Sequence, residues 1–209
     1  MPDFDLPARW LRENYKCDDR LAVVLRYPAT GDVKQKTATA EEIAAPKYQA
    51  HLRAANANGA DVYVTMNALL PEAKSRTRAD VDQIRHVYLD LDSGGREAVE
   101  RILREPGMAE PHHIFESSPG KYQMIWQVEG FEKDQAESLM RNYAIKFEAD
   151  RAATDCSRVM RMPGFRNHKY EQVHWVKDVQ DAASNRIYRP EDFPTYLIQQ
   201  EIISRGRQA

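Results

Sequence analysis

Two apolar segments joined by a short turn constrain the fold of this chain more than any other feature. His113–Ser117 and Tyr122–Val128 are expected strands, and Ser118-Pro119-Gly120-Lys121 between them predicts a four-residue hairpin connection. A hairpin pairs its strands antiparallel, which excludes an all-parallel sheet. Because helices alternate with strands elsewhere along the chain, the sequence predicts an α+β fold with a mixed, largely antiparallel sheet.

The spacing of apolar residues, together with turn residues and helix-capping residues, predicts the other helices and strands. Thr39 and Glu42 have the spacing of a capping box, and Pro46 is expected to end the helix that starts there and to begin another. The remaining expected helices are Asp5–Tyr15, Arg96–Arg104 and Asp134–Phe147, and the remaining strands are Leu21–Tyr27, Val33–Thr37, Asp61–Met66, His86–Asp92 and His174–Val179. Asn67–Asp82 and Asp150–Asn167 are polar, so we expect loops there.

Length and composition are those of an ordinary globular protein. The 209 residues suffice for one large domain over residues 1–185, followed by an extension over 186–209 that is either a terminal helix or the start of an accessory domain. Two widely spaced cysteines argue against a zinc ribbon or a disulfide scaffold and favour a cytoplasmic location. No apolar run has the length of a membrane helix, and the net charge of -2 excludes a histone-like nucleic-acid binder.

The sharpest chemical feature is the acidic pair in Asp90-Leu91-Asp92, at the end of an apolar strand. Side chains alternate across a strand, so Asp90 and Asp92 share one face. Adjacent carboxylates repel each other unless a cation lies between them, and such oxygen ligands suit Mg²⁺ or Mn²⁺. The pair predicts a metal site, with acids that merely face solvent as the alternative.

Two further segments supply candidate groups for binding anions. In the hairpin, Ser118 and Gly120 allow close approach of the backbone, Lys121 adds charge, and Gln123 is a polar side chain on an apolar strand. A later segment contains a third acid and a series of donors that match phosphate or sugar, namely Asp155, Arg158, Arg161, Asn167, His168 and Lys169. The alternatives are a plain hairpin tip and a basic surface loop, although apolar residues interleaved with the later donors favour partial burial.

Together, three acids, a polar hairpin and a basic segment are the groups needed for phosphoryl or nucleotidyl transfer. The sequence contains no G-x-x-x-x-G-K-[ST] loop, so it does not predict a P-loop enzyme. It contains no G-x-S-x-G motif either, which argues against a serine hydrolase.

The order of V-Y-L-D-L-D, S-S-P-G-K-Y-Q-M-I-W and D-x-x-R-x-x-R-x-P-G-F-R-N-H-K resembles the archaeo-eukaryotic primase superfamily. Within it, the chain is most similar to the RepB-like primases of plasmids. N-A-N-G-A-D-V-Y-V at Asn56–Val64 resembles the lead-in strand of that family, and the likeness runs from Ala55 to Lys169. It implies a catalytic domain within residues 1–185, with a core of RRM-like topology and an added N-terminal α/β unit.

The resemblance also implies a function. It is that of a DNA primase or primase-polymerase of a plasmid, phage or other mobile element, which transfers nucleotides on a single-stranded DNA template with Mg²⁺ or Mn²⁺. By the same likeness Asp90, Asp92 and Asp155 are the catalytic, metal-binding acids. Ser118, Lys121 and Gln123 would contact the incoming nucleoside triphosphate, and the triphosphate or template would be bound by Arg158, Arg161, Asn167, His168 and Lys169. A replicative helicase or a helical accessory domain could be a further partner, and a membrane is not one.

One position departs from the superfamily. Many members carry a histidine where this chain has Gln123, and glutamine can donate a hydrogen bond but cannot carry charge. RepB-like members resemble this chain there, so we interpret Gln123 as a subfamily trait. Two other functions stay open: a non-catalytic single-stranded-DNA-binding initiation module of the same fold, and a different palm-like nucleotidyl transferase such as a cyclase. The intact acids argue against the first, and R-x-P-G-F-R-N-H-K has no evident role in the second.

Overall fold

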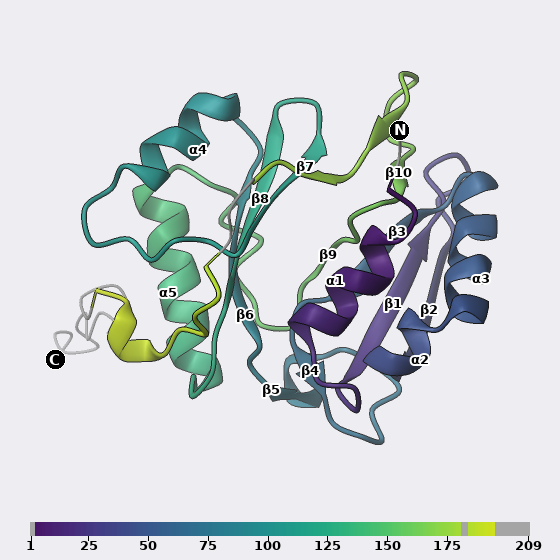
Figure 1. The fold of residues 1–209 in the computed structure, drawn as a ribbon, viewed down its shortest axis with the longest axis horizontal. Coiled ribbons are helices and arrows are strands. Elements are labelled where there is room, and N and C mark those ends of the chain that lie inside the picture. The colour runs from purple at the N-terminus through teal and green to yellow at the C-terminus, as the bar shows by residue number, and fades with distance from the viewer. Residues whose placement is uncertain (1–2, 181–183, 195–209) are drawn as a thin grey trace, which may run out of the picture.

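The computed structural model describes residues 3–180 and 184–194, and its strands form two main sheets that lie next to each other (Figure 1). In the first sheet, β1 (Arg20–Arg26) pairs with β2 (Val33–Thr39) on one side and with β3 (Asp61–Thr65) on the other. The sheet is completed by β4 (Ala68–Leu69), β5 (Val81–Gln83) and β9 (Val159–Arg161). The order in the second sheet is β12 (Lys177–Asp178), β7 (His113–Ser118), β8 (Lys121–Gln127) and β6 (His86–Leu91). All these ladders are antiparallel.

Helices cover the outer sides of both sheets (Figure 1). The first sheet is flanked by α2 (Ala40–Ala44) and α3 (Pro46–Ala57). The second is flanked by α4 (Gly95–Leu103) and α5 (Lys133–Lys146). The inner sides of the two sheets are therefore left to face each other.

Helix α1 (Leu6–Asn14) connects the two sheets. Its Trp10 is buried and packs against rings of the second sheet, with centroid distances of 5.8 Å to Phe115 and 6.5 Å to His86. Just after the helix, the hydroxyl group of Tyr15 donates to the carbonyl oxygen of Thr65 at 2.9 Å, in the first sheet. Apolar burial on one side and a hydrogen bond on the other fix the two sheets relative to each other.

The capping and proline signals around residue 40 are confirmed. The Thr39 hydroxyl accepts from the Glu42 N–H at 3.2 Å, and the Glu42 carboxylate accepts from the Thr39 N–H at 2.8 Å. Pro46 begins α3, where its missing N–H costs nothing, after α2 has ended at Ala44. These local signals set both helix boundaries.

The hairpin is tighter than expected. β7 extends to Ser118 and β8 starts at Lys121, so only Pro119 and Gly120 form the connection. Gly120 has a φ of +70°, a backbone conformation that short hairpin turns often require and that glycine adopts without strain. Ser118 and Lys121 thus belong to the sheet and not to a loop.

Short strands occur in both segments that were expected to be loops. Residues 67–82 contain β4, a 3₁₀ turn, η1 (Arg78–Asp80), and the first two residues of β5. Residues 150–167 contain β9 and β10 (Arg166–Asn167). The expected strand over 174–179 is divided at Val176 into β11 (His174–Trp175), which pairs with β10, and β12. Strands of two or three residues are too short for a periodic signal, and they form here because neighbouring strand edges supply hydrogen-bond partners.

The α+β class is confirmed, and β6-α4-β7-β8-α5 follows the RRM-like order with β6 beside β8. One strand departs from that order: β9 follows α5 along the chain, yet it pairs with β3 of the first sheet. This exchange places the segment after α5 between the two sheets.

The described part of the C-terminal extension packs on the second sheet. Tyr188 forms a parallel bridge with Val128, and the ring of Phe193, after η2 (Pro190–Asp192), lies 5.7 Å from that of Phe131. Of the terminal helix expected over Pro190–Ile203, residues 195–203 lie outside the described residues, and Pro190–Asp192 form the 3₁₀ turn η2. Among the described residues, no helix has the length and apolar character needed to cross a membrane.

Candidate active site

A cleft of about 420 Å³ opens between the inner sides of the two sheets. The first sheet contributes residues from β1, β3 and β9, and the second contributes residues from β6, β7 and β8 together with segments that follow α5 and β10. The lining residues are Arg26, Pro28, Asp61, Tyr63, Asp90, Asp92, Ser117, Ser118, Lys121, Gln123, Asp150, Ala153, Arg158, Val159, Arg161 and Lys169. Eight of the eleven side chains expected from the sequence are therefore brought together: Asp90, Asp92, Ser118, Lys121, Gln123, Arg158, Arg161 and Lys169.

The acidic pair lies where strand alternation predicts. Asp90 and Asp92 both face the cleft, whereas Leu89 and Leu91 are buried in the core. Burial, followed by the negative charges of Asp92 and Asp150, raises the pKa of Asp90 to about 7. A carboxyl group in this environment favours a nearby cation, because a cation offsets both the burial and the repulsion.

Asp150, which no sequence pattern singled out, is a further acid in the cleft besides Asp90, Asp92 and Asp61. Its N–H donates to the carbonyl oxygen of Asp90 at 2.9 Å, which fixes the start of the segment after α5 against the end of β6. The expected third acid, Asp155, does not line the cleft. Its carboxylate accepts from the Ser157 hydroxyl at 2.7 Å and pairs with Arg158 at 2.8 Å.

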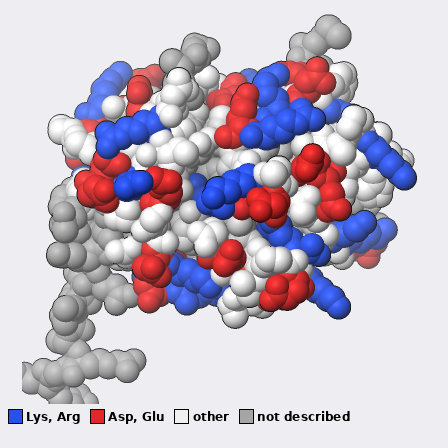
Figure 2. Space-filling view, turned by 60° about the horizontal axis from the view of Figure 1, so that its bottom comes forward, with Lys and Arg blue, Asp and Glu red and all other residues white. Residues whose placement is uncertain are grey.

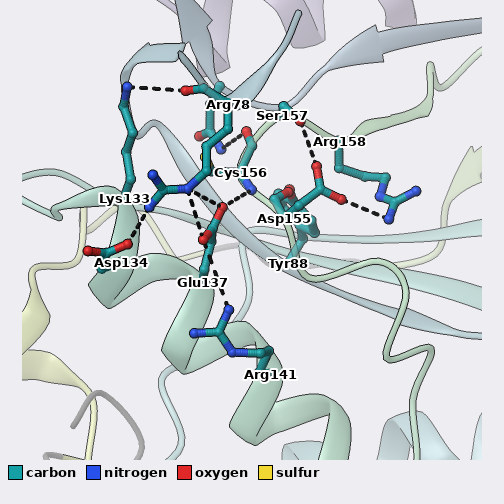
Figure 3. A network of polar contacts seen from close by, with 11 residues as sticks. Arg78, Tyr88, Lys133, Asp134, Glu137, Arg141, Asp155, Cys156, Ser157 and Arg158 are labelled. Atoms are coloured by element: carbon teal, nitrogen blue, oxygen red, sulfur yellow. Dashed lines mark hydrogen bonds and ion pairs between the residues drawn. The ribbon is translucent and has the colours of Figure 1, made fainter. Parts of the chain in front are cut away.

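A polar network holds Asp155 and Arg158 in place (Figure 3). Glu137, on α5, is buried and accepts from the Cys156 N–H and from the Arg78 guanidinium, both at 3.1 Å. Figure 3 also shows Asp155 turned toward Arg158 and away from Glu137. Because hydrogen bonds to a buried carboxylate are expensive to break, this network fixes the backbone from which Arg158 reaches the cleft.

Lys121 and Gln123 lie beside the acidic pair on β8. The ammonium group of Lys121 donates to Asp92 at 2.7 Å. Gln123 is the cross-strand partner of Asp90, and its Oε1 is buried without a hydrogen-bond partner among the described residues. An unsatisfied buried amide oxygen is costly, so Gln123 has capacity for a donor brought by a ligand.

Ser118 and Asn167 are joined to each other. The Asn167 side-chain amide donates to the Ser118 hydroxyl and to the Ser117 carbonyl oxygen, both at 2.8 Å, and Asn167 is fully buried. Asn167 therefore connects β10 to β7 and does not itself line the cleft.

Arg161 forms a buried ion pair with Asp61 at 2.7 Å and stacks over the Tyr63 ring, 4.8 Å from its centroid. Asp61 also accepts from the N–H of His168 at 2.7 Å. It thus fixes both a cleft arginine and the backbone that carries Lys169. His168 does not line the cleft and lines a second pocket instead.

Four charged or aromatic residues of the cleft were not expected from the sequence: Arg26, Asp61, Tyr63 and Asp150. Asp61 and Tyr63 alternate with the buried Val62 and Val64 on β3, so strand period could have placed them on the face of a site. Arg26 and Asp150 have no comparable local signal.

The donor set suits a hard divalent cation, since the acids supply only oxygen ligands. Among residues 3–180 and 184–194, no three His, Cys, Asp or Glu side chains form a ready cluster for a metal ion. Positive charges in the cleft are balanced by acids, and on the face in Figure 2 basic and acidic side chains are interspersed without a continuous patch of either sign. Any attraction for an anion is consequently local.

Solved structures define the class of fold. The AEP domain of the cyanophage S-2L primase-polymerase aligns with a TM-score of 0.70 at 17% identity, covering 95% of this chain and 99% of that domain. The catalytic domain of primase RepB′ in complex with initiator DNA aligns with a TM-score of 0.63 at 22% identity, covering 84% and 85%. The longer RepB′ primase structure gives the same score, and this chain spans 56% of it. The fold is that of an archaeo-eukaryotic primase domain.

The sequence identifies the family within that class. The profile of the RepB DNA-primase N-terminal domain matches residues 29–200. The chain belongs to this family. No curated protein sequence matches the chain closely enough to count as a relative.

Proposed function

We propose that this chain is the catalytic domain of a DNA primase or primase-polymerase from a plasmid, phage or other mobile element. The observation that carries the proposal is the cleft itself, in which Asp90 and Asp92 on one sheet lie across from Arg158 and Arg161. Acids that suit metal ions and cations that suit phosphate are the two groups of side chains that nucleotidyl transfer needs. Membership of the RepB primase family supports the same reaction.

Asp90, Asp92 and Asp150 would hold Mg²⁺ or Mn²⁺. Such an ion would supply Lewis-acid chemistry, lowering the pKa of the attacking hydroxyl group and neutralising charge on the phosphates. The raised pKa of Asp90 and the place of Asp150 beside it support this set. In the proposal Asp150 takes the role that the resemblance gave to Asp155, and Asp155 instead positions Arg158.

The remaining cleft residues would bind the nucleotide and the template. Arg158 and Lys169 can donate to phosphate oxygens, and Arg161 is held on Tyr63 for the same purpose. No donor of the described residues reaches the buried amide oxygen of Gln123 beside Asp90, and Lys121 reaches the same edge. Ser118, bound to Asn167, presents the hairpin to the cleft.

We infer that the template is single-stranded DNA. The solved complex of the RepB′ catalytic domain contains initiator DNA, and that domain shares the fold of this chain. A helicase or a helical accessory domain would assist initiation in the cell.

Primer synthesis tests the proposal. Wild-type protein is incubated with single-stranded DNA, labelled nucleotides and Mg²⁺ or Mn²⁺, with Asp90→Ala in parallel and with a pre-annealed primer in a second series. We expect products from the wild type only. Extension without initiation would indicate that an accessory domain starts primers. Absence of product in both series, with DNA still bound, would refute the enzyme and favour the non-catalytic initiation module.

A further inference from the structure

A second pocket, of about 380 Å³, lies on the other side of β10 from the cleft. It shares no lining residue with the cleft and joins the N-terminal segment, α3 and the β10–β11 hairpin. The lining residues are Phe4, Arg53, Asn56, Ala57, Gly164, Phe165, Arg166, His168 and Trp175.

Two aromatic rings at this pocket are open to solvent. Phe4 is 52% exposed, and Trp175, half-buried, meets it edge to face with the centroids 6.2 Å apart. Trp10 and Trp126, in contrast, are 1% and 0% exposed. Accessible aromatic rings beside cationic groups are the usual platform on which single-stranded nucleic acids stack their bases.

The charged side chains that line the pocket, Arg53 and Arg166, are both cationic. Arg53 stacks on Phe4, with its guanidinium carbon 5.1 Å from the ring centroid. Nε of Arg166 and Nε2 of His168 are buried and have no hydrogen-bond partner among the described residues. No carboxylate of residues 3–180 or 184–194 lines the pocket. An unpaired buried guanidinium N–H in a pocket without acids calls for an anionic ligand.

Strand alternation divides one short segment between the two sites. Asn167 turns toward β7 and Lys169 toward the cleft, while Arg166 and His168 turn into the second pocket. A DNA strand that leaves the cleft at Lys169 thus has cationic side chains on both sides of β10.

We propose that this pocket binds one nucleotide of single-stranded DNA outside the active cleft. The base stacks on Trp175 and Phe4, and the phosphate accepts hydrogen bonds from Arg166, Arg53 and His168. The inference rests on the proposed function only in taking DNA as the ligand. It adds a binding site for the DNA strand at a distance from the reacting atoms.

Tryptophan fluorescence provides a direct test. Because the other two tryptophans are buried, quenching on addition of an oligothymidylate reports stacking on Trp175. We expect wild-type fluorescence to fall as DNA binds. Binding is followed independently by anisotropy of labelled DNA, so that a lack of quenching cannot be confused with a lack of binding.

Substitutions then show which residues of the pocket bind the DNA. Trp175→Ala and Arg166→Ala should each weaken DNA binding about tenfold, the loss expected for one stacked base or one charged contact. Trp175→Phe should keep near-normal affinity while losing the fluorescence change. Arg104→Ala, at the residue directly after α4 and 78% exposed at its side chain, is the matched control and should bind DNA normally. If Trp175→Ala fails to fold, the DNA affinity of Arg166→Ala and the quenching in the wild type still show whether the pocket binds DNA.

The outcomes separate this inference from the proposed function. Unchanged DNA affinity in Arg166→Ala and Trp175→Ala, or DNA binding without quenching, would overturn the pocket even if the wild type synthesises primers. Quenching together with weakened binding in both variants would support the pocket even if no primer is made. In an active enzyme the variants should raise the KM for template and leave kcat unchanged. Quenching by an acidic peptide in place of DNA would assign the pocket to a protein partner and refute the proposal.

Discussion

The ammonium group of Lys121 lies 2.7 Å from Oδ1 of Asp92, across adjacent strands at the open side of the cleft. The hydrogen bond to Asp92 raises the pKa of Lys121, so this side chain stays charged at neutral pH. A divalent cation on Asp92 would compete with the ammonium group. The displaced lysine would then be available to a nucleotide phosphate, which links binding of the metal to binding of the nucleotide.

Lys121→Ala should tighten Mn²⁺ binding and weaken nucleotide binding. A half-exposed ion pair contributes up to about 1 kcal/mol, so the Kd for Mn²⁺ should fall about two- to fivefold without nucleotide. The KM for nucleotide should rise in the same variant. Electron paramagnetic resonance of free Mn²⁺ and primer-extension kinetics measure the two effects. Lys121→Arg should stay close to wild type in both, and weaker Mn²⁺ binding by Lys121→Ala would contradict the competition.

Asp90→Asn should abolish nucleotidyl transfer and yet stabilise the metal-free fold. The pKa of Asp90 is about 7 in the folded state against an ordinary 3.8, so the folded state holds the proton more tightly. The carboxylate therefore weakens folding as pH rises from 4 to 7. Asn removes this penalty, and the free energy of unfolding should increase by roughly 2–4 kcal/mol at pH 8 and by little near pH 4. Urea unfolding with a chelator checks this; equal effects at both pH values would contradict it.

Asp150→Asn and Asp155→Asn should change different kinetic constants of the enzyme. Asp150 lies in the cleft, so its loss should lower kcat about a hundredfold or more and weaken Mn²⁺ binding. Asp155 touches Arg158 and Ser157, so its loss should chiefly raise the KM for nucleotide and leave Mn²⁺ binding unchanged. Reversal of these two patterns would restore Asp155 as the third metal-binding acid.

Asp61→Asn should destabilise the fold. It leaves Arg161, whose side chain is 12% exposed, without its counter-charge, which costs roughly 3–5 kcal/mol. For a chain of this size the Tm should fall by about 10 °C. The double variant Asp61→Asn/Arg161→Met should recover most of that loss in thermal unfolding and still be inactive. No recovery would show that Asp61 acts through the His168 N–H instead.

Much of the fold could be predicted because its signals are local. The capping box at Thr39, the break at Pro46 and the shared face of Asp90 and Asp92 depend on residues a few positions apart. The partition of strands between two sheets depends on distant partners. β9, for example, pairs with β3 almost a hundred residues earlier, and its three residues carry no period that indicates this.

The site was harder to predict where a segment lacks regular structure. Asp150 and Asp155 are five residues apart in a turn-rich stretch, and only tertiary contacts distinguish them: Asp150 donates to Asp90 and lines the cleft, whereas Asp155 pairs with Arg158. Phe4 and Trp175 come from opposite ends of the chain, so nothing in either neighbourhood indicates their contact. Contacts of this kind depend on tertiary packing and not on the secondary-structure propensity of either segment.

The alternation of side chains at β10 limits the changes that this segment can accept. Arg166 and His168 serve one compartment and Lys169 the other, while Asn167 anchors the strand between them. A single substitution can therefore alter one site and spare its neighbour. Insertion or deletion of one residue between Gly164 and Lys169 would shift the alternation by one position. Side chains that now face the cleft would then face the second pocket, and the reverse. We expect natural variation here to consist of replacements at constant length.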